Sequence, residues 1–426
     1  MGPGRHSEAV GPPALGIGAN AGQFALLVAI SAFVGAMVGL ERSVMPLLAR
    51  DEFGVQSATA AVSFVASFGA AKAVTNLFAG AISERLGRRR VLIAGWLAGV
   101  PVPAILIWAP SWDWVIAANL LLGLNQGLAW SMTVNMKLDL AGPKQRGLAL
   151  GLNESAGYLA VAATAYLSGV IADEYGLGPE PFYLGLAFAA CGLALSVLFV
   201  RDTGHLVPTR PAAGPQLSLA SAFRDASWRR RDLFALSQAG FVNNMNDALA
   251  WGIFPLLFAA RGLSLERIGV LAAVYPLVWA LLQVGTGWAS DLFGRRPLIA
   301  GGMLLQAGAI TLVAAAGGFT WWLAAVALLG AGTAMVYPTL LAGVSDAVPE
   351  QDRATTLGVY RFWRDAGAIA GALTAGAVAD LLDFEAAILG VATLTALSGA
   401  IAAAALRGSD NSKRMRTLIV ATVERR

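Results

Sequence analysis

Much of the sequence consists of apolar segments whose lengths match the thickness of a membrane. Residues 91–109 and 181–200, for example, contain no charged side chain. A helix needs about 20 residues to cross the roughly 30 Å hydrocarbon core of a bilayer. Only 13% of the chain is charged, whereas a soluble protein carries about 25%. This pattern predicts an all-α protein embedded in a membrane.

Twelve such segments can be counted, and we predict a transmembrane helix for each. They cover residues 22–48, 57–82, 91–109, 112–138, 147–171, 181–200, 233–259, 266–289, 297–317, 320–345, 354–379 and 384–406. A longer polar stretch at 201–232 separates six helices from the other six. We therefore predict two six-helix bundles, at 22–200 and 233–406, joined by a cytoplasmic linker. The tails at 1–21, which we expect to be disordered, and at 407–426 flank them.

The basic residues predict which ends of the helices face the cytoplasm. Most of the 30 Lys and Arg residues fall in the tails, the linker and the loops of one side, and Lys137 is counted with them. The loops of the other side hold only Arg50, Arg261 and Arg267. Because cytoplasmic loops are rich in Lys and Arg, we expect both termini in the cytoplasm. The excess of Arg over Lys, 26 against 4, together with abundant Ala and Gly, is typical of a GC-rich prokaryotic genome, so we expect the protein in a prokaryotic plasma (inner) membrane. This placement accounts for the net charge of +4 without binding to nucleic acid.

The two halves of the chain repeat one another. Residues 80–90 read GAISERLGRRR, and residues 287–297, which begin 207 positions later, read GWASDLFGRRP. The same offset pairs Gly123 with Gly330, Asp139 with Asp346, Arg146 with Arg353, and Asp173 with Asp380. A six-helix unit duplicated in parallel orientation is typical of transporters built from two bundles.

Both repeated segments resemble the signature loop of the major facilitator superfamily, G-x-x-x-D-[RK]-x-G-[RK]-[RK]. The first copy has Glu84 at the acidic position, and the second has Leu292 at the first basic position. The resemblance implies the twelve-helix fold of that superfamily and a gating role for both loops, in which charged side chains hold neighbouring helix ends. The residues concerned are Gly80, Glu84, Arg85, Gly87, Arg88, Gly287, Asp291, Gly294 and Arg295.

Two further motifs of the superfamily are incomplete. The fourth predicted helix has Gly123 where an R-x-x-Q-G pattern would place arginine, and the fifth, at 147–171, lacks a Gly- and Pro-rich antiporter motif. These departures weigh against a place among the drug/proton exchangers.

Ionisable side chains inside the predicted helices are the strongest indication of function. Each costs about 2.5–3.5 kcal/mol on insertion scales, and such residues normally face a bundle interior or a water-filled cavity. Four are basic and four acidic: Glu41, Arg42, Lys72, Glu154, Asp247, Arg361, Arg364 and Asp365. They can pair with one another, and Lys72 could pair with Glu154 or with Glu41.

Three of these charges lie on one face of the eleventh predicted helix. Arg361, Arg364 and Asp365 stand at positions i, i+3 and i+4, which share a helix face. Two guanidinium groups there would suit an anionic solute, because arginine binds carboxylate and phosphate through a planar fork. In the alternative interpretation, Arg361 and Asp365 neutralise each other and only hold helices together.

Polar residues in the seventh predicted helix point to the same cavity. Asn243, Asn246 and Asp247 share a face, while Asn244 points elsewhere. We expect that face to line the cavity and Asp247 to be a candidate proton carrier. The competing interpretation is a polar contact between helices.

Two further helices contribute candidates at matching heights. Gln126 and Trp130 lie in the fourth helix, and Tyr337 occupies the position of Trp130 in the repeat. Aromatic and amide groups at equivalent positions of both halves fit a binding site between the bundles.

Several other kinds of function lack the residues that they need. The single Cys191 lies in an apolar segment, both histidines lie outside the predicted helices, and no phosphate-loop, zinc or nucleophile motif is present. We therefore expect no metal, no cofactor and no enzyme activity. The sequence predicts a secondary active transporter, working as a monomer in the lipid bilayer, that moves a small anion or zwitterion by alternating access, coupled to protons. The alternatives are an exporter of lipophilic compounds and a non-transporting sensor on the same fold.

Overall fold

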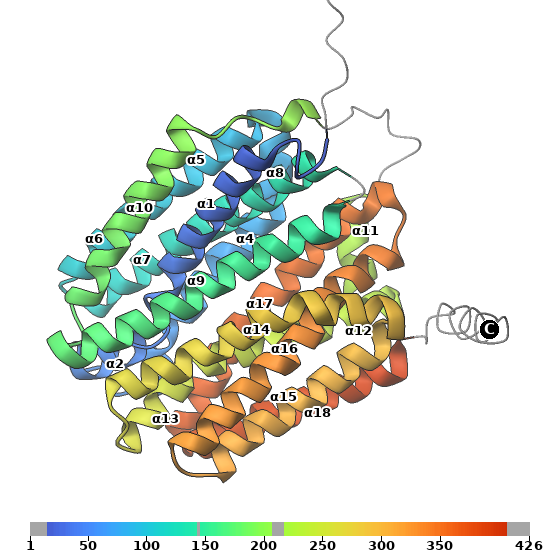
Figure 1. Cartoon of the computed structure of the whole chain (residues 1–426). Coiled ribbons are helices and arrows are strands. Elements are labelled where there is room, and N and C mark those ends of the chain that lie inside the picture. The colour runs from blue at the N-terminus through green and yellow to red at the C-terminus, as the bar shows by residue number, and fades with distance from the viewer. Residues whose placement is uncertain (1–14, 143–144, 207–216, 407–426) are drawn as a thin grey trace, which may run out of the picture.

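The computed structural model describes residues 15–142, 145–206 and 217–406, and within these ranges no residue forms a β-strand (Figure 1). The elements of the first half are α1 (Ala21–Gly39), α2 (Met45–Asp51), α3 (Ala58–Ala61), α4 (Ser63–Leu86), α5 (Arg88–Gly99), α6 (Pro101–Trp108), α7 (Trp112–Asn125), the π-helix η1 (Gln126–Trp130), α8 (Ser131–Ala141), α9 (Arg146–Tyr175) and α10 (Glu180–Leu198). The linker holds η3 (Gly204–Leu206), α11 (Leu219–Arg224) and η4 (Asp225–Arg229). The second half contains α12 (Arg231–Ala248), η5 (Leu249–Ile253), α13 (Phe254–Ala260), α14 (Leu265–Phe293), α15 (Arg295–Ala315), α16 (Phe319–Ala347), η6 (Glu350–Asp352), α17 (Arg353–Leu381) and α18 (Phe384–Ala405).

The predicted helical membrane fold is confirmed. Ten helical spans in the described residues are long and apolar enough to cross a bilayer. The other two predicted spans also form. One is α12 to α13, which η5 interrupts, and the other is α17, which carries three charges near its middle. Their polar residues explain why hydropathy alone does not detect them.

The first and seventh spans are both interrupted close to their polar residues. α1 ends at Gly39 and α2 begins at Met45, so Glu41 and Arg42 lie in the turn between them. In the seventh span the π-turn η5 separates α12 from α13. A proline follows each interruption, at Pro46 in α2 and Pro255 in α13. Pro46 follows a non-helical turn, so its missing N–H costs no hydrogen bond.

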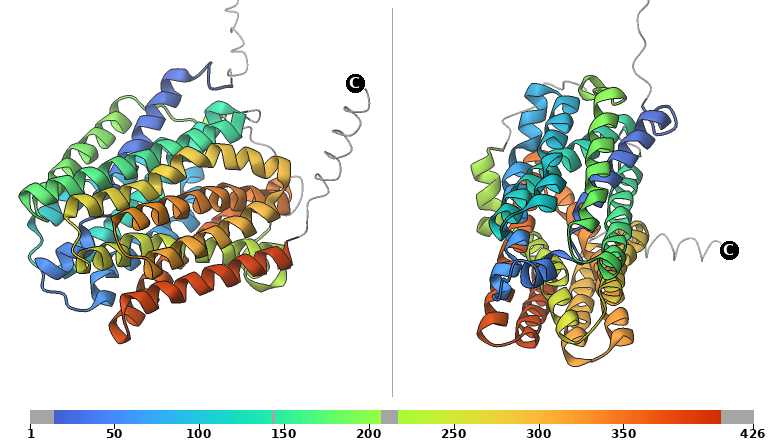
Figure 2. Two further views of the ribbon diagram at one scale, coloured as in Figure 1. Left: turned by 60° about the horizontal axis from the view of Figure 1, so that its bottom comes forward. Right: turned by 90° about the vertical axis from the view of Figure 1, so that its left-hand side faces the viewer.

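The two halves pack side by side along their long helices. α9 lies against α14 and α17 against α4, so each contact joins one helix of either half, and Figure 2 shows the halves from two sides. A Cβ added to Gly169 would lie 2.6 Å from the Cα of Gly269. Because that distance is below van der Waals contact, glycine is required where α9 crosses α14.

We name the two ends of the molecule by their loops. The basic end carries the arginine-rich α4–α5 and α14–α15 loops, and the distal end carries α2, α3 and α13 (Figure 1). Residues 15–20, predicted as part of a disordered tail, form a turn at the basic end, where Gly16 N–H donates to Leu140 O at 2.8 Å. The rest of that tail, the C-terminal tail and the middle of the linker lie outside the described residues.

The last part of the linker folds onto the second half. The Phe223 ring lies 5.4 Å from that of Trp363 in α17, and Trp363 Nε1 donates to Ser227 Oγ at 3.0 Å. The linker therefore contacts the same helix that carries Arg361, Arg364 and Asp365.

The two signature loops make equivalent ion pairs. Arg88 Nη2 donates to Asp139 Oδ1 at 3.2 Å. At the equivalent position of the second half, Arg295 Nε donates to Asp346 Oδ2 at 3.0 Å, and Arg295 also pairs with Asp291 at 2.6 Å. Each pair ties the start of one helix to the end of another within the same half, and the predicted gating role remains a prediction.

A carboxylate from the linker also stabilises the first signature loop. Asp202 Oδ2 accepts a hydrogen bond from Arg89 N–H at 2.9 Å, and Asp202 Oδ1 accepts one from Gly204 N–H at 2.8 Å. Partial burial raises the pKa of Asp202, but these two hydrogen bonds and the charge of Arg88 outweigh burial and hold the pKa below its usual value. Asp202 therefore stays ionised at the N-terminus of α5, where a negative charge is favourable.

Candidate functional site in a cavity between the halves

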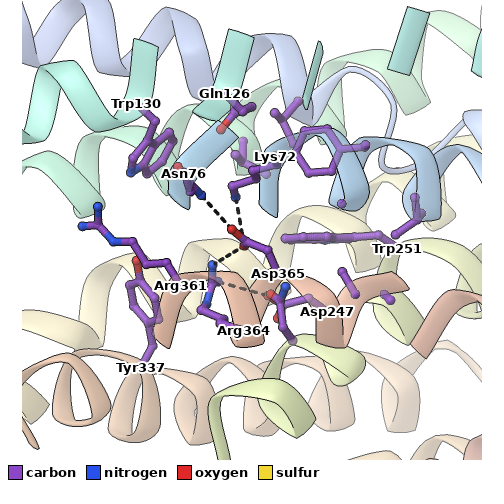
Figure 3. Close-up of a pocket in the computed structure, with 18 of the residues that line it drawn as sticks. Lys72, Asn76, Gln126, Trp130, Asp247, Trp251, Tyr337, Arg361, Arg364 and Asp365 are labelled. Atoms are coloured by element: carbon purple, nitrogen blue, oxygen red, sulfur yellow. Dashed lines mark hydrogen bonds and ion pairs between the residues drawn. The ribbon is translucent and has the colours of Figure 1, made fainter. Parts of the chain in front are cut away.

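A cavity lies between the halves and is lined by both of them (Figure 3). Most of the site residues predicted from the sequence line it, namely Arg42, Lys72, Gln126, Trp130, Asp247, Tyr337, Arg361, Arg364 and Asp365. Their helices are far apart in the sequence, so the cavity exists only when the two halves are packed together.

Asp365 is the centre of an ionic network that joins the halves (Figure 3). Its carboxylate accepts a hydrogen bond from Asn76 Nδ2 at 2.7 Å and lies 3.8 Å from Lys72 Nζ, both on α4. On its own helix it lies 3.4 Å from Arg364 Nη1. Arg364 also lies 3.6 Å from Asp247 of α12. The side chain of Asp365 is only 2% exposed, and such buried charges are tolerated only when they are paired.

Asp247 has a second partner inside the second half. It accepts a hydrogen bond from the hydroxyl of Tyr275 in α14, and that hydroxyl also lies 3.2 Å from Thr333 Oγ1. Asp247 is therefore held between a tyrosine and Arg364.

Arg361 lines the cavity without a polar partner among the described residues. It makes no ion pair and no hydrogen bond there, although the sequence allowed a pair with Asp365. Asp365 instead turns to Lys72 and Arg364, and Figure 3 shows the Arg361 side chain extending away from it. The guanidinium of Arg361 is thus available to a solute.

Arg42 faces the cavity through aromatic contacts. Its guanidinium lies 5.1 Å from the ring centre of Phe68 and 4.7 Å from that of Trp251, and such cation–π contacts are strongest away from water. The side chain is 1% exposed, and its Nε and Nη1 make no hydrogen bond to the described residues.

Glu41 lies behind Arg42 and does not line the cavity. It is 1% exposed, and neither carboxylate oxygen accepts a hydrogen bond of ordinary geometry from the described residues. The groups that act on it electrostatically are the neighbouring Arg42 guanidinium and the amide of Asn119 in α7.

Glu154 also stands behind the lining, but it contacts both halves. Its Oε1 accepts a hydrogen bond from Trp130 Nε1 at 3.1 Å, and its Oε2 accepts one from Tyr337 Oη at 3.0 Å. Because Trp130 and Tyr337 line the cavity, Glu154 positions one aromatic side chain of each half.

The structure corrects the placement of Lys137, which was counted among the basic residues of the cytoplasmic side although it lies near the end of the predicted helix 112–138. Lys137 is fully buried, and its Nζ donates to Leu27 O at 3.0 Å and to Ser31 Oγ at 2.6 Å. Ser31 Oγ donates to Asn153 Oδ1, and Asn153 Nδ2 donates to Glu154. The ammonium is buried because α8 continues to residue 141 and turns this position towards α1.

The structure also corrects the face of α12 that was expected to line the cavity. Asn243 and Asn246 both hydrogen-bond to Gln306 of α15 inside the second half. Asn244 lines the cavity together with Asp247. Hydrogen bonds to Gln306 offset part of the cost of burying these amides, which is consistent with their place inside the bundle and not at the cavity.

Three aromatic residues of the lining were missed from the sequence: Phe68, Tyr158 and Trp251. Two of them carried a usable signal, because Tyr158 follows Glu154 by four positions and Trp251 follows Asp247 by four, the spacing of one helix face. Phe68 carried none, since apolar residues are common throughout a membrane helix.

The comparison with known families identifies the chain. A sequence model described as Major Facilitator Superfamily matches residues 24–237 and 236–418. The chain belongs to this superfamily. Its doubled six-helix architecture and its paired signature loops agree with that assignment.

Individual relatives are distant. The chain is 26% identical over 369 residues to an uncharacterized MFS-type transporter, YddS, of Bacillus subtilis, a match that covers 83% of this chain and 84% of the relative. Among solved structures, it resembles a mutant of the nucleoside transporter NupG with a TM-score of 0.75 at 11% identity, over 90% of this chain and 100% of the other. It also resembles the human organic anion transporter MFSD10, with a TM-score of 0.67 at 18% identity, over 89% and 99% of the two chains. These two likenesses show the fold alone.

Proposed function

We propose that the protein is a secondary active transporter that moves a small anion, organic or inorganic, or a zwitterion with an acidic group, by alternating access. The observation that carries the proposal is the guanidinium of Arg361, which lines a cavity between the two halves and has no ion pair or hydrogen bond to any residue that the structure describes. The described lining contains four basic side chains, Arg42, Lys72, Arg361 and Arg364, against the two carboxylates Asp247 and Asp365. An excess of positive charge in a cavity that low-dielectric protein surrounds attracts an anion.

The proposal includes an orientation and a coupling ion. We place the basic end and both termini in the cytoplasm of a plasma membrane, because arginine-rich loops stay on that side. The chain offers buried carboxylates but no ATP-binding motif. A proton gradient is therefore the energy source that these residues favour, and one monomer contains the complete cavity.

Aromatic side chains favour a second candidate within the same class. Phe68, Trp130, Tyr158, Trp251 and Tyr337 all line the cavity. Such a lining also suits a lipophilic compound without an acidic group. The same experiment can separate the two candidates.

The test uses the purified full-length protein in liposomes that contain a pH-sensitive dye. Benzoate, lactate, phosphate, glycine and tetraphenylphosphonium are added outside in turn, and protein-free liposomes correct for weak acids that cross the bilayer unaided. We expect one or more of the acidic compounds to change the internal pH faster than in the protein-free control. A response to tetraphenylphosphonium alone would favour the exporter, and no response to any compound would contradict transport of these solute classes.

A further inference from the structure

We propose that Glu41 is the proton-binding site of this transporter, and that a proton on Glu41 increases the affinity of the neighbouring Arg42 for the anion. The inference rests on the proposed function and adds the direction in which the proton moves relative to the anion. Proton and anion bind cooperatively, so they move in the same direction.

Glu41 differs from the other buried carboxylates in what surrounds it. Asp365 has Lys72, Arg364 and Asn76, and Asp247 has Arg364 and Tyr275. Glu154 has no ion pair among the described residues, but its oxygens accept hydrogen bonds from Trp130, Asn153 and Tyr337. A proton that binds to either aspartate therefore disrupts a formed ion pair. Neither oxygen of Glu41 has a hydrogen-bond donor of ordinary geometry among the described residues. Among the described residues, only the charge of Arg42 and the amide of Asn119 offset the desolvation of an ionised carboxylate in this place.

The position of Glu41 connects its protonation to the cavity. It lies one residue before Arg42, which lines the cavity, while Glu41 itself does not. The charged group that acts on Glu41 is Arg42, and the polar one is Asn119 of α7. Arg42 is acted on in turn by Glu41, by Asp247 of α12 and by Tyr158 of α9.

Charge compensation then gives the cooperativity. When Glu41 is ionised, its negative charge offsets the positive charge of Arg42. Arg42 then adds little to the affinity of the cavity for an anion. With Glu41 neutral, Arg42 presents an uncompensated guanidinium whose Nε and Nη1 have no hydrogen-bond partner in the described residues. Coupling free energies of this kind correspond to about 5- to 150-fold in affinity, and they act equally in both directions.

The test measures thermal stabilisation of the purified protein by benzoate, lactate and phosphate at pH 5.5 and at pH 8. In the wild type we expect apparent affinity for at least one of these anions to be about tenfold higher at the lower pH. Glu41→Gln mimics the protonated acid, so its affinity should be high and independent of pH. Glu52→Gln, the same exchange at an exposed position of the distal end, should behave as the wild type.

The outcomes separate this inference from the proposed function. Stabilisation of the wild type, with a pH dependence that survives in Glu41→Gln, overturns the inference alone. Absence of stabilisation by all three anions at both pH values contradicts the proposed function and the inference with it. A Glu41→Gln protein that unfolds on purification is replaced by Arg42→Gln, which should bind weakly at both pH values. A pH-dependent Arg42→Gln would also overturn the inference.

A second inference comes from the distal end. We propose that Asp380 and Asp173 act as paired latches that hold the two halves together there. Asp380, at the end of α17, accepts hydrogen bonds from Ser57 Oγ at 2.7 Å, Ala58 N at 2.5 Å and Thr59 N at 3.0 Å. All three donors lie at the start of α3, in the other half.

The repeat supplies the second latch. Asp173 of α9 accepts a hydrogen bond from the backbone N–H of Glu266 at 3.4 Å, in the first turn of α14. Asp173 and Asp380 are 207 residues apart, as are the helix caps Ser57 and Ser264. Each latch places a carboxylate of one half at the N-terminus of a helix of the other, where negative charge is favourable. If the distal end opens, both must break.

Spin labels measure that opening. Spin labels are attached at Trp114→Cys and Leu382→Cys in a Cys191→Ser background. Both positions are exposed and lie near the distal end, one in each half, so the distance between the labels reports how far the halves separate there. We expect Asp380→Ala to raise the population of the longer distance about tenfold, because several hydrogen bonds to a charged group are lost. Asp173→Ala should have a smaller effect, since its bond is single and long. Asp383→Ala is the matched control, because Asp383 caps α18 in its own half. Unchanged distances in the Asp173/Asp380 double variant would overturn the proposal.

Discussion

Replacement of Arg364 by methionine is expected to abolish transport and to destabilise the folded protein by about 3–5 kcal/mol, the range for removing one partner of a buried ion pair. Arg364 is 6% exposed and lies between Asp247 and Asp365. Its guanidinium also lies 4.6 Å from the ring centre of Tyr337. Without it, Asp365 keeps only Lys72 as an ion-pair partner among the described residues, and Asp247 keeps none.

A second substitution tests whether charge is the cause. In Arg364→Met/Asp247→Asn one carboxylate is neutralised as well, so we expect part of the lost stability to return without transport. Thermal unfolding in detergent and uptake into liposomes measure the two effects. Arg267→Met is the matched control, because Arg267 is exposed and stacks on Phe319 at the distal end. An Arg364→Met protein as stable as this control would contradict a structural role for the ion pairs.

The membrane fold was readable from the sequence because its determinants are local. Each span needs only a sufficient length of apolar residues, and the offset between positions 80 and 287 fixes the duplication. Even α17 was found, although three charges interrupt it, because the flanking residues remained apolar. The bounds of helices and spans therefore followed within a few residues.

The pairing of charges was not readable, because it depends on how each helix is rotated. Arg361 and Asp365 have the spacing of an intrahelical pair, yet Asp365 finds Lys72 and Asn76 on α4 instead. Lys137 was counted with the loops because it lies near a helix end, and burial against α1 is a tertiary effect. In each case a neighbour from a distant part of the chain offered a better contact than the local one.

The interruptions of the first and seventh spans could be predicted only in part from the sequence. Pro46 and Pro255 mark where the new helices begin, and these signals are local. The sequence does not reveal that the turn before Pro46 hides Glu41 while presenting Arg42 to Phe68 and Trp251. That division of two adjacent residues depends on packing against other helices and so required the packed structure.

Arg361→Gln is expected to weaken uptake of the transported acid without lowering the stability of the protein, whereas Arg364→Met is expected to impair both. Arg361 has no hydrogen bond or ion pair to lose among the described residues, so thermal stability should stay close to that of the wild type. A charge-assisted hydrogen bond contributes about 1.5–3 kcal/mol, which corresponds to about 10- to 150-fold in affinity. The concentration of a transported acid that gives half-maximal uptake should therefore rise by about that factor.

The conservative exchange refines the interpretation. Arg361→Lys keeps the charge but not the planar fork that binds a carboxylate in a bidentate manner, so its uptake should fall between those of the glutamine variant and the wild type. Uptake at several solute concentrations, measured beside thermal unfolding, separates the two effects. If Arg361→Gln transports the acid with unchanged half-saturation, the anion is not bound by this guanidinium. If it unfolds as readily as Arg364→Met, Arg361 has a structural role instead. A loss of affinity at unchanged stability is the result that distinguishes a solute-binding arginine from one that joins the two halves.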